Sequence, residues 1–238
     1  MKRIFLLSIL LLEGIIVFSQ ISGLYSFKLN DDIRCRIIFY EDNKYYIELV
    51  DEVYPDHYDG TLISRGTFHI YNNNIELTDK FHNYKMTLFR KDEELIVKSG
   101  IKGLIDKHFI YRGTLKSFGT FIPKDKILNI NKEREDYKQL NKELFPFESG
   151  LYTAPSWANL SFDYILRIKP DNTYILYCRV IVFSEGTWTR NGNELILRDN
   201  DLNTSFYLLI AANNTFSSKL LPGYCDRCYF KRFFMIDK

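Results

Sequence analysis

The chain has 238 residues, of which 46% are hydrophobic and 26% are charged, so it has enough apolar side chains to bury a core. Its 32 basic residues nearly balance its 30 acidic ones, and a net charge of +2 argues against the concentrated basic face of a nucleic-acid-binding protein. Twelve glycines and six prolines are too few for a collagen-like or low-complexity chain. Aromatic residues make up 16%, nearly all Phe and Tyr, which favours β-strands.

The amino-terminal segment has the pattern of a secretory signal. Lys2 and Arg3 precede an apolar run over residues 4–18, as the charged and hydrophobic regions of such a signal require. An uncleaved membrane anchor is the alternative, but this run is shorter than the roughly 20 apolar residues of a membrane span and contains Glu13. We therefore expect residues 1–19 to be a cleaved signal peptide and the mature protein to be extracytoplasmic, periplasmic or secreted, without stable membrane insertion.

The rest of the chain contains an internal repeat. Three segments of the first copy return in the second: SGLYS at 22–26 as SGLYT at 149–153, DNKY at 42–45 as DNTY at 171–174, and SRGTF at 64–68 as SEGTW at 184–188. From residue 64 onward the offset stays at 120, and so regular an offset indicates a duplication. The predicted organisation is a first repeat over 20–112, a linker over 113–148 and a second repeat over 149–238.

Within each copy, apolar and polar residues alternate with the period of a β-strand. Leu62 and Val182 are expected on the inward faces of equivalent strands. Gly66 and Gly186 lie in the middle of those strands, where a missing side chain predicts a sharp bend or bulge.

Turn signals divide each copy into about eight short strands. In the first copy they are expected at 22–29, 34–40, 44–49, 61–70, 74–78, 84–90, 94–99 and 108–112. Sequential antiparallel strands remove their exposed edges by closing into a barrel, and a two-sheet sandwich is the alternative. We predict an all-β fold of two tandem eight-strand antiparallel meander barrels, lipocalin-like, each around its own apolar interior and joined by a linker with one short helix.

The predicted helix covers residues 131–144 of the linker. Tyr137, Leu140 and Leu144 recur at helical spacing, and Pro146 ends the pattern. A single narrow apolar seam usually serves local packing, so we interpret the helix as a spacer packed against one barrel; a partner-binding helix is the alternative.

The order of the repeated motifs is similar to that of a known group of proteins. Each copy runs from Gly-x-Tyr through Asp-Asn-x-Tyr and Gly-Thr-aromatic to a closing aromatic-x-x-Arg. This order resembles the small lipocalin-like barrels exported by Bacteroidetes and other Gram-negative bacteria, and EGTW at 185–188 is similar to a strand of the amino-terminal barrel of copper-resistance and envelope-stress lipoproteins. The chain departs from those lipoproteins because it has no cysteine at the signal junction and no early Cys-x-x-Cys in either copy. The resemblance implies a fold whose members often bind small apolar ligands.

Cys225 and Cys228 form the most conspicuous short motif. They flank a two-residue turn, which brings their Cα atoms within disulfide range, and in an oxidising compartment a disulfide is the expected outcome. A zinc site, with Cys178 as a conceivable third of about four ligands, and a redox-active thiolate are the alternatives. No metal or cofactor is predicted, and Cys35 is expected to be a buried thiol.

An insertion at 51–60 is the first place to expect a specific binding site, because functional residues concentrate on the loops of a rigid scaffold. Its Tyr54, His57 and Tyr58 are candidate ligand-binding residues, although a cation-binding loop and a plain solvated loop are alternatives. Phe68 and Trp188 are candidates for lining a barrel interior. The four histidines show no metal-ligand spacing and are expected at the surface: His57, His69, His82 and His108.

The sequence contains no catalytic signature, neither a nucleophile elbow nor a phosphate-binding glycine loop nor a zinc-protease helix. We therefore expect a non-catalytic exported protein. One hypothesis is that a barrel binds a small apolar ligand; the other is that side chains fill both barrels and the protein is an envelope scaffold or protein-interaction module. An eight-strand barrel is just wide enough for either, so the packing of its interior decides.

Overall fold

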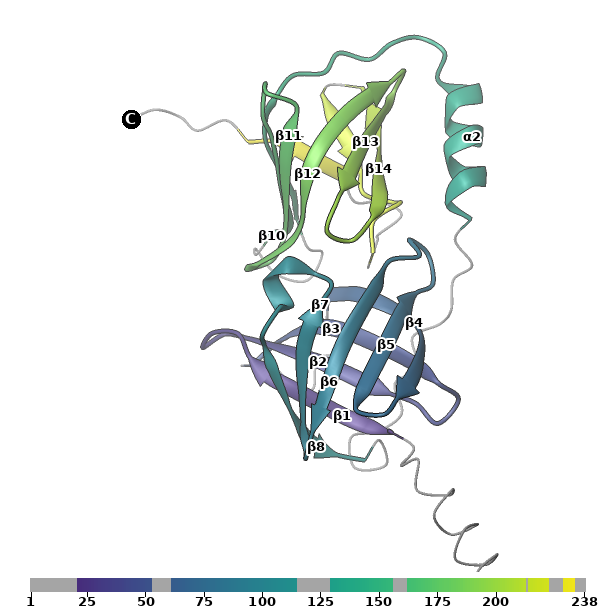
Figure 1. The fold of residues 1–238 in the computed structure, drawn as a ribbon. Helices are drawn as coiled ribbons and strands as arrows, with labels where there is room; N and C mark the ends of the chain where they lie inside the picture. Colours follow the sequence, from purple (N-terminus) through teal and green to yellow (C-terminus); the bar gives the residue numbers. More distant parts are fainter. Residues whose placement is uncertain are drawn as a thin grey trace, which may run out of the picture.

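The chain forms two closed antiparallel barrels stacked end to end, the first in purple and blue and the second in green and yellow in Figure 1. This computed structural model describes residues 21–52, 61–114, 129–155, 162–212, 214–222 and 229–233. Within those ranges the chain is all-β apart from the α-helix α2 (Ile130–Leu140) and the short 3-10 helix η1 (Lys102–Leu104). The predicted fold class is confirmed, and at a coarse level two tandem eight-strand barrels fit a lipocalin-like fold.

The first barrel is a meander of β1 (Gly23–Lys28), β2 (Ile33–Phe39), β3 (Lys44–Asp51), β4 (Thr61–Tyr71), β5 (Asn74–Asp79), β6 (Lys85–Lys91), β7 (Glu94–Ser99) and β8 (His108–Gly113). Each strand pairs with the next, and β1 pairs with β8, where Tyr25 lies opposite Tyr111. Asn72 and Asp92, at tight turns between strands, have φ values of 53° and 54°. Asn and Asp tolerate this left-handed conformation better than most residues, which is why such short turns can close the meander.

The second barrel repeats this arrangement with β9 (Gly150–Pro155), β10 (Phe162–Ile168), β11 (Thr173–Cys178), β12 (Ile181–Asn191), β13 (Glu194–Asp199), β14 (Thr204–Ala211), β15 (Thr215–Ser217) and β16 (Tyr229–Arg232). Here β9 closes the barrel by pairing with both β10 and β16. The duplicated sequence therefore folds into duplicated structure.

Both copies carry the same irregularity in their fourth strand. The pairing of β4 with β3 skips Ile63, and the pairing of β12 with β11 skips Phe183. Ile63 and Phe183 are fully buried, whereas Leu62 and Val182 are only partly buried. The expectation that Leu62 and Val182 face inward is wrong, because one extra residue in a strand moves the side chains before it to the opposite face.

Gly66 and Gly186 lie where the fourth strand of each barrel approaches the fifth most closely. A Cβ at Gly66 would lie 1.9 Å from the carbonyl oxygen of Thr78, and one at Gly186 would lie 2.1 Å from that of Arg198. No side chain fits at such distances, so the backbones can meet only at glycine. A bulge, one of the two irregularities predicted at these glycines, is instead at Ile63 and at its counterpart in β12.

The apolar core is continuous through both barrels. At the junction the ring of Tyr84 packs on those of Phe183 and Phe206, with centroids 6.5 and 6.2 Å apart. Arg179 of the second barrel also donates to Asp51 of the first at 3.0 Å. Each barrel closes on itself, but the two apolar interiors are not separate as predicted, because their facing ends pack against each other.

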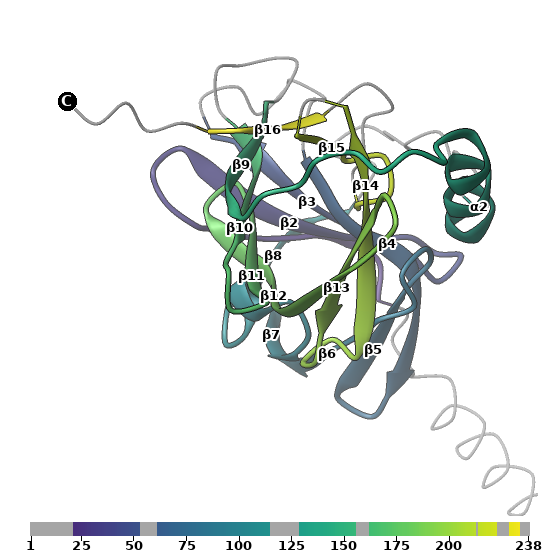
Figure 2. The same ribbon diagram turned by 90° about the horizontal axis from the view of Figure 1, so that it is seen from above.

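Helix α2 lies beside the second barrel, along β14, as Figures 1 and 2 show from two directions. Asn129 caps its first turn by accepting a hydrogen bond from the Lys132 amide at 3.0 Å. Arg134 pairs with the buried carboxylate of Glu194, and the Tyr137 hydroxyl donates to the carbonyl of Ile210. The helix is thus held to the barrel by polar groups.

The helix ends at Leu140, before the predicted end at Leu144, because both the amide and the side chain of Asn141 bond to the carbonyl of Tyr137. Leu140 is 83% exposed and Leu144 71% exposed, so the predicted apolar seam is wrong. Within the part of the chain that the structure describes, no helix is long and apolar enough to cross a membrane.

Candidate functional site

A buried polar network stands at the end of β5 in the first barrel. The hydroxyls of Tyr45 and Ser64 lie 2.7 Å apart, and Ser64 donates to the carboxylate of Asp79 at 3.0 Å. The same carboxylate accepts hydrogen bonds from three backbone amides, those of Arg65, Phe81 and His82. Ser64 and Asp79 are each 1% exposed, and a buried carboxylate is tolerated only when its oxygens are bonded in this way.

The second barrel repeats the network with Tyr174, Ser184 and Asp199. The two hydroxyls lie 2.6 Å apart, Ser184 donates to Asp199 at 2.7 Å, and the Leu202 amide donates to the same carboxylate at 2.9 Å. Burial raises the pKa of both tyrosines, Tyr45 and Tyr174, above the ordinary value of a phenol. Because the same bonds recur in both copies, the network is structural: it fixes the turn that follows the fifth strand.

In the first barrel, the network fixes the turn formed by residues 80–84. This turn contacts the second barrel. Asn83 adopts a φ of 60°, which lets the chain reverse tightly. The carbonyl of His82 accepts a hydrogen bond from the Thr204 hydroxyl at 2.7 Å, and the His82 ring packs against Phe206 with centroids 4.9 Å apart. The turn therefore belongs to both barrels, being fixed at Asp79 and docked at β14.

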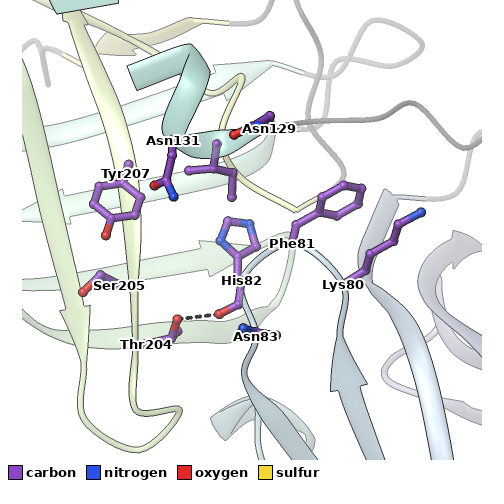
Figure 3. Close-up of a pocket in the computed structure, with 10 residues that line it drawn as sticks. Lys80, Phe81, His82, Asn83, Asn129, Asn131, Thr204, Ser205 and Tyr207 are labelled. Carbon is purple, nitrogen blue, oxygen red and sulfur yellow. Dashed lines mark hydrogen bonds between the residues drawn. The ribbon is translucent and has the colours of Figure 1, made fainter. Parts of the chain in front are cut away.

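A cavity of about 450 Å³, called the junction cavity below, lies where this turn meets β14 and the start of α2 (Figure 3). Lys80 and His82 line it from the turn, residues 129–131 from the helix, and Thr204 and Tyr207 from the strand. None of its ten described lining residues carries a carboxylate. The junction cavity thus brings together three segments that are distant in the sequence.

His82 is the most unusual residue of the junction cavity. It is 6% exposed, and neither ring nitrogen has a hydrogen-bond partner among the described residues. In Figure 3 its ring points toward the start of α2, beside Asn131. Burial lowers the pKa of His82, an effect that the charge of Asp79 opposes. A neutral imidazole offers one hydrogen-bond donor and one acceptor, and here both lie next to a cavity.

A smaller cavity of about 290 Å³ shares Lys80 and Asn83 with the junction cavity. Arg65 lines it, is 7% exposed, and holds its guanidinium 4.5 Å from the ring centroid of Phe81. Among its described lining residues, Asp79 is the one carboxylate and Lys44, Arg65 and Lys80 are cations. The described surroundings of the turn therefore carry more positive than negative charge.

The two interior candidates from the sequence lie in different barrels. Phe68 is 2% exposed inside the first barrel and meets Phe39 edge to face at 4.9 Å. Trp188 is partly buried in the second barrel, where its indole nitrogen donates to the carbonyl of Lys169 at 3.0 Å. The structure does not bring these two side chains together. Three further candidates lie outside the described residues: Tyr54, His57 and Tyr58.

The predicted disulfide between Cys225 and Cys228 also lies outside the described residues. The two cysteines that are described, Cys35 and Cys178, are fully buried. Burial raises the pKa of the Cys35 thiol well above its usual value, which suits the inert thiol predicted from the sequence. Among the described residues, no cluster of three His, Cys, Asp or Glu side chains has a geometry for a metal ion.

Sequence reasoning missed the junction cavity and placed His82 wrongly at the surface. Turns usually lie at the surface, but this turn is buried against the other barrel. The repeat contained a usable signal: at the offset of 120, His82 matches Leu202, an apolar residue that is 5% exposed. A histidine at a position where the other copy has a buried leucine is a candidate for function.

Comparison of the chain with protein-family models, with curated proteins and with solved structures finds no match. The candidate site is therefore interpreted from its own geometry.

Proposed function

We propose that this protein is an exported, non-catalytic scaffold or protein-interaction module whose barrels are filled by their own side chains. Export is proposed from the signal-like pattern of residues 1–19. The proposal also groups the chain with the small barrels exported by Bacteroidetes, which its repeated motifs resemble. In this function the barrels form a rigid framework, and binding takes place outside them.

The packing of the barrel interiors carries the proposal. Large side chains that are at most 2% exposed occupy both interiors, among them Phe39, Tyr45, Phe68 and Phe109 in the first barrel and Tyr152, Phe183, Phe206, Phe216 and Phe230 in the second. An eight-strand barrel has room for its side chains or for one small ligand. Because aromatic rings take up that room here, the filled-barrel hypothesis has more support than storage of an apolar ligand.

The buried hydroxyls support a non-catalytic function. Ser64 and Ser184 each donate to a carboxylate, but they are 1% and 0% exposed and therefore closed to a substrate. The imidazole of His82 makes no hydrogen bond to Ser64, since its ring nitrogens have no partner among the described residues. A serine nucleophile needs an adjacent base and access to its substrate, and neither accompanies these residues.

Mass spectrometry of the protein purified from its native host and extracted under denaturing conditions tests the filled interior. The expected result is that no lipid or other apolar molecule is released in stoichiometric amount. A stoichiometric apolar molecule would overturn the proposal and restore ligand storage.

A cavity-forming variant provides the matched control. Phe68→Ala removes a buried ring and is expected to open an apolar void that binds benzene, as engineered core cavities do. The wild-type protein is expected not to bind benzene under the same conditions, as followed by NMR shifts of interior methyl groups. Equal binding by both proteins would show that the interior is already open.

Amino-terminal sequencing of the protein from its native host tests the export part of the proposal. The mature chain is expected to begin at Gln20. A mature chain that retains Lys2 and Arg3 would contradict cleavage.

A further inference from the structure

We propose that the junction cavity binds a small organic anion, with its phosphate or carboxylate group beside Lys80 and the first turn of α2 and its neutral body against His82. This inference goes beyond the scaffold function, because it assigns a ligand to a site outside the barrel interiors.

The charges around the junction cavity favour an anion. The first amides of an α-helix have no acceptor within the helix and carry the positive end of its dipole. In α2 the Asn129 side chain already accepts from the Lys132 amide, and residues 129–131 line the cavity at this positive end of the helix. The exposed ammonium group of Lys80 borders the same space. The one acidic residue in the first turn of α2, Glu133, is paired with Lys219. Among the described residues that line the cavity, none carries a carboxylate, and the carboxylate of Asp79 at the start of the turn is bonded to the donors of the network.

The buried cation next to the junction cavity adds to this preference. Arg65 is 7% exposed and lies over the ring of Phe81, whose other neighbours include the Lys80 ammonium at 5.7 Å from the ring centroid. A positive charge in a poorly solvated position acts over a longer range than one at the surface, because water screens it less. Arg65 and Lys80 place two positive charges on the turn side of the cavity, against the one negative charge of the network carboxylate Asp79.

The imidazole of His82 is the second, independent indication of a ligand. Its ring nitrogens are buried beside the cavity without a partner among the described residues, and a buried polar group without a hydrogen bond is destabilising. The other copy has Leu202 at the equivalent position, equally buried, so packing alone does not require a histidine. A polar group of a ligand in the cavity would supply the missing hydrogen bond.

The size and walls of the junction cavity indicate an organic anion larger than a bare ion. Its volume of about 450 Å³ falls within the range of small-molecule sites, roughly 300–1,000 Å³. The rings of Phe81 and Tyr207 line it, although Arg65 covers one face of Phe81 and Arg134 one face of Tyr207. Ser205 offers a hydroxyl, and the hydroxyl of Thr204, which donates to the His82 carbonyl, can still accept a hydrogen bond. A polar ring that bears one acidic group, such as a sugar phosphate or a sugar acid, matches these walls.

Four probes titrated into the full chain test the proposal: glucose 6-phosphate, glucuronate, inorganic phosphate and uncharged glucose. Binding is measured by calorimetry and by the NMR signals of the four histidine rings, in which His82 is assigned by its loss in the His82→Leu variant. At least one of the two charged sugars is expected to bind and to shift the His82 signal more than glucose does. The comparison of phosphate with carboxylate identifies the acidic group. If neither charged sugar moves the His82 signal at about 10 mM, or if glucose binds as tightly, the proposal is overturned.

Two site variants and one matched control locate the binding. His82→Leu installs the residue of the other copy, and Lys80→Met removes an exposed charge; each is expected to weaken binding about tenfold or more, because each removes a hydrogen bond to the ligand. Lys91→Met makes the same charge change at the far end of β6 and is expected to leave affinity unchanged. Should His82→Leu fail to fold, as judged by circular dichroism, Lys80→Met still decides. Equal affinities for Lys80→Met, Lys91→Met and the wild type would overturn the assignment.

Discussion

The two barrels share one polar network but differ in the turn that the network holds. Asp79 and Asp199 occupy equivalent positions, and each accepts a hydrogen bond from the serine of its own barrel. The turns that follow have different sequences, KFHN at 80–83 and NDLN at 200–203. The network therefore maintains the fold in both copies, whereas the sequence of the turn that follows it differs between them.

The charges of the two copies differ in the same region. Arg65 in the first barrel corresponds to Glu185 in the second at the offset of 120. Arg65 lies over Phe81 beside the cavities, whereas Glu185 pairs across the junction with Lys102 of the first barrel. At this pair of equivalent positions, the first copy thus has a cation beside the cavities and the second has a carboxylate that pairs across the junction.

The largest expected effect comes from removing the network carboxylate in each copy. Asp79→Ala leaves Ser64 and three backbone amides without their acceptor and is expected to lower the free energy of unfolding by about 3 kcal/mol or more. Asp199→Ala is expected to cost less, because fewer donors among the described residues bond to Asp199. Urea denaturation measures both. A larger decrease in the free energy of unfolding for Asp199→Ala than for Asp79→Ala would contradict this ranking of the two networks.

Alanine at the close-approach glycines is expected to have the next largest effect. Gly66→Ala and Gly186→Ala place a Cβ against a carbonyl oxygen, and each is expected to cost about 1–3 kcal/mol, as overpacking of a core does. Gly192→Asn is the control, because a Cβ added at residue 192 would have nothing within 4 Å and because Asn tolerates the φ of 63° that this residue adopts. Thermal unfolding should show two similar losses and little change for the control; tolerance of either alanine would refute the close approach.

The helix that lies against the second barrel allows a smaller test. Tyr137→Phe removes the hydrogen bond to the Ile210 carbonyl and is expected to cost about 1 kcal/mol. Leu140→Ser changes a side chain that is 83% exposed and is expected to change stability by less than about 0.5 kcal/mol. Chemical denaturation measures both variants. If the helix were attached through an apolar seam, Leu140→Ser would lower the free energy of unfolding more than Tyr137→Phe.

The pH dependence of stability is expected to differ between the turns of the two copies. Burial lowers the pKa of His82 below the 6.5 of an ordinary histidine, so the unfolded chain binds its proton first as the pH falls. Above about pH 6.5 the imidazole is neutral in the folded and the unfolded protein, and the free energy of unfolding is at its highest. The free energy of unfolding decreases as the pH falls from there through the lower pKa of the folded protein. His82→Leu should flatten this part of the profile, measured by urea midpoints between about pH 7.5 and 5. An unchanged slope would mean that His82 is not the titrating group.

The fold was predictable because the sequence repeats the residues that determine it. Tyr45 lies in DNKY, Ser64 in SRGTF and Asp79 in IELTD, all of them segments or positions that the second copy matches. Alternation along the strands and turn residues between them then predict the meander. The bulge at Ile63 was not predictable in this way, since one extra residue leaves no mark in a short alternating pattern.

The junction cavity could not be predicted from the sequence, because its walls come from three places far apart in the chain. Lys80, Ile130 and Thr204 meet only after both barrels have closed and stacked. Helix α2 was predicted to pack through Leu140, but the actual attachment is through Arg134 and Glu194, and a pair of charged residues gives no periodic signal. Only the difference between His82 and Leu202 pointed to the site in advance.

The stability of His82→Leu at about pH 7.5, where the imidazole is neutral, tests most directly the claim that this histidine serves binding rather than packing. The urea midpoint is expected to stay equal to that of the wild type or to rise, because leucine occupies the same position in the other barrel and has no polar side-chain atom to leave unbonded at position 82. A fall of about 1 kcal/mol or more in the free energy of unfolding would contradict it, since the imidazole would then be part of the packing that joins the barrels.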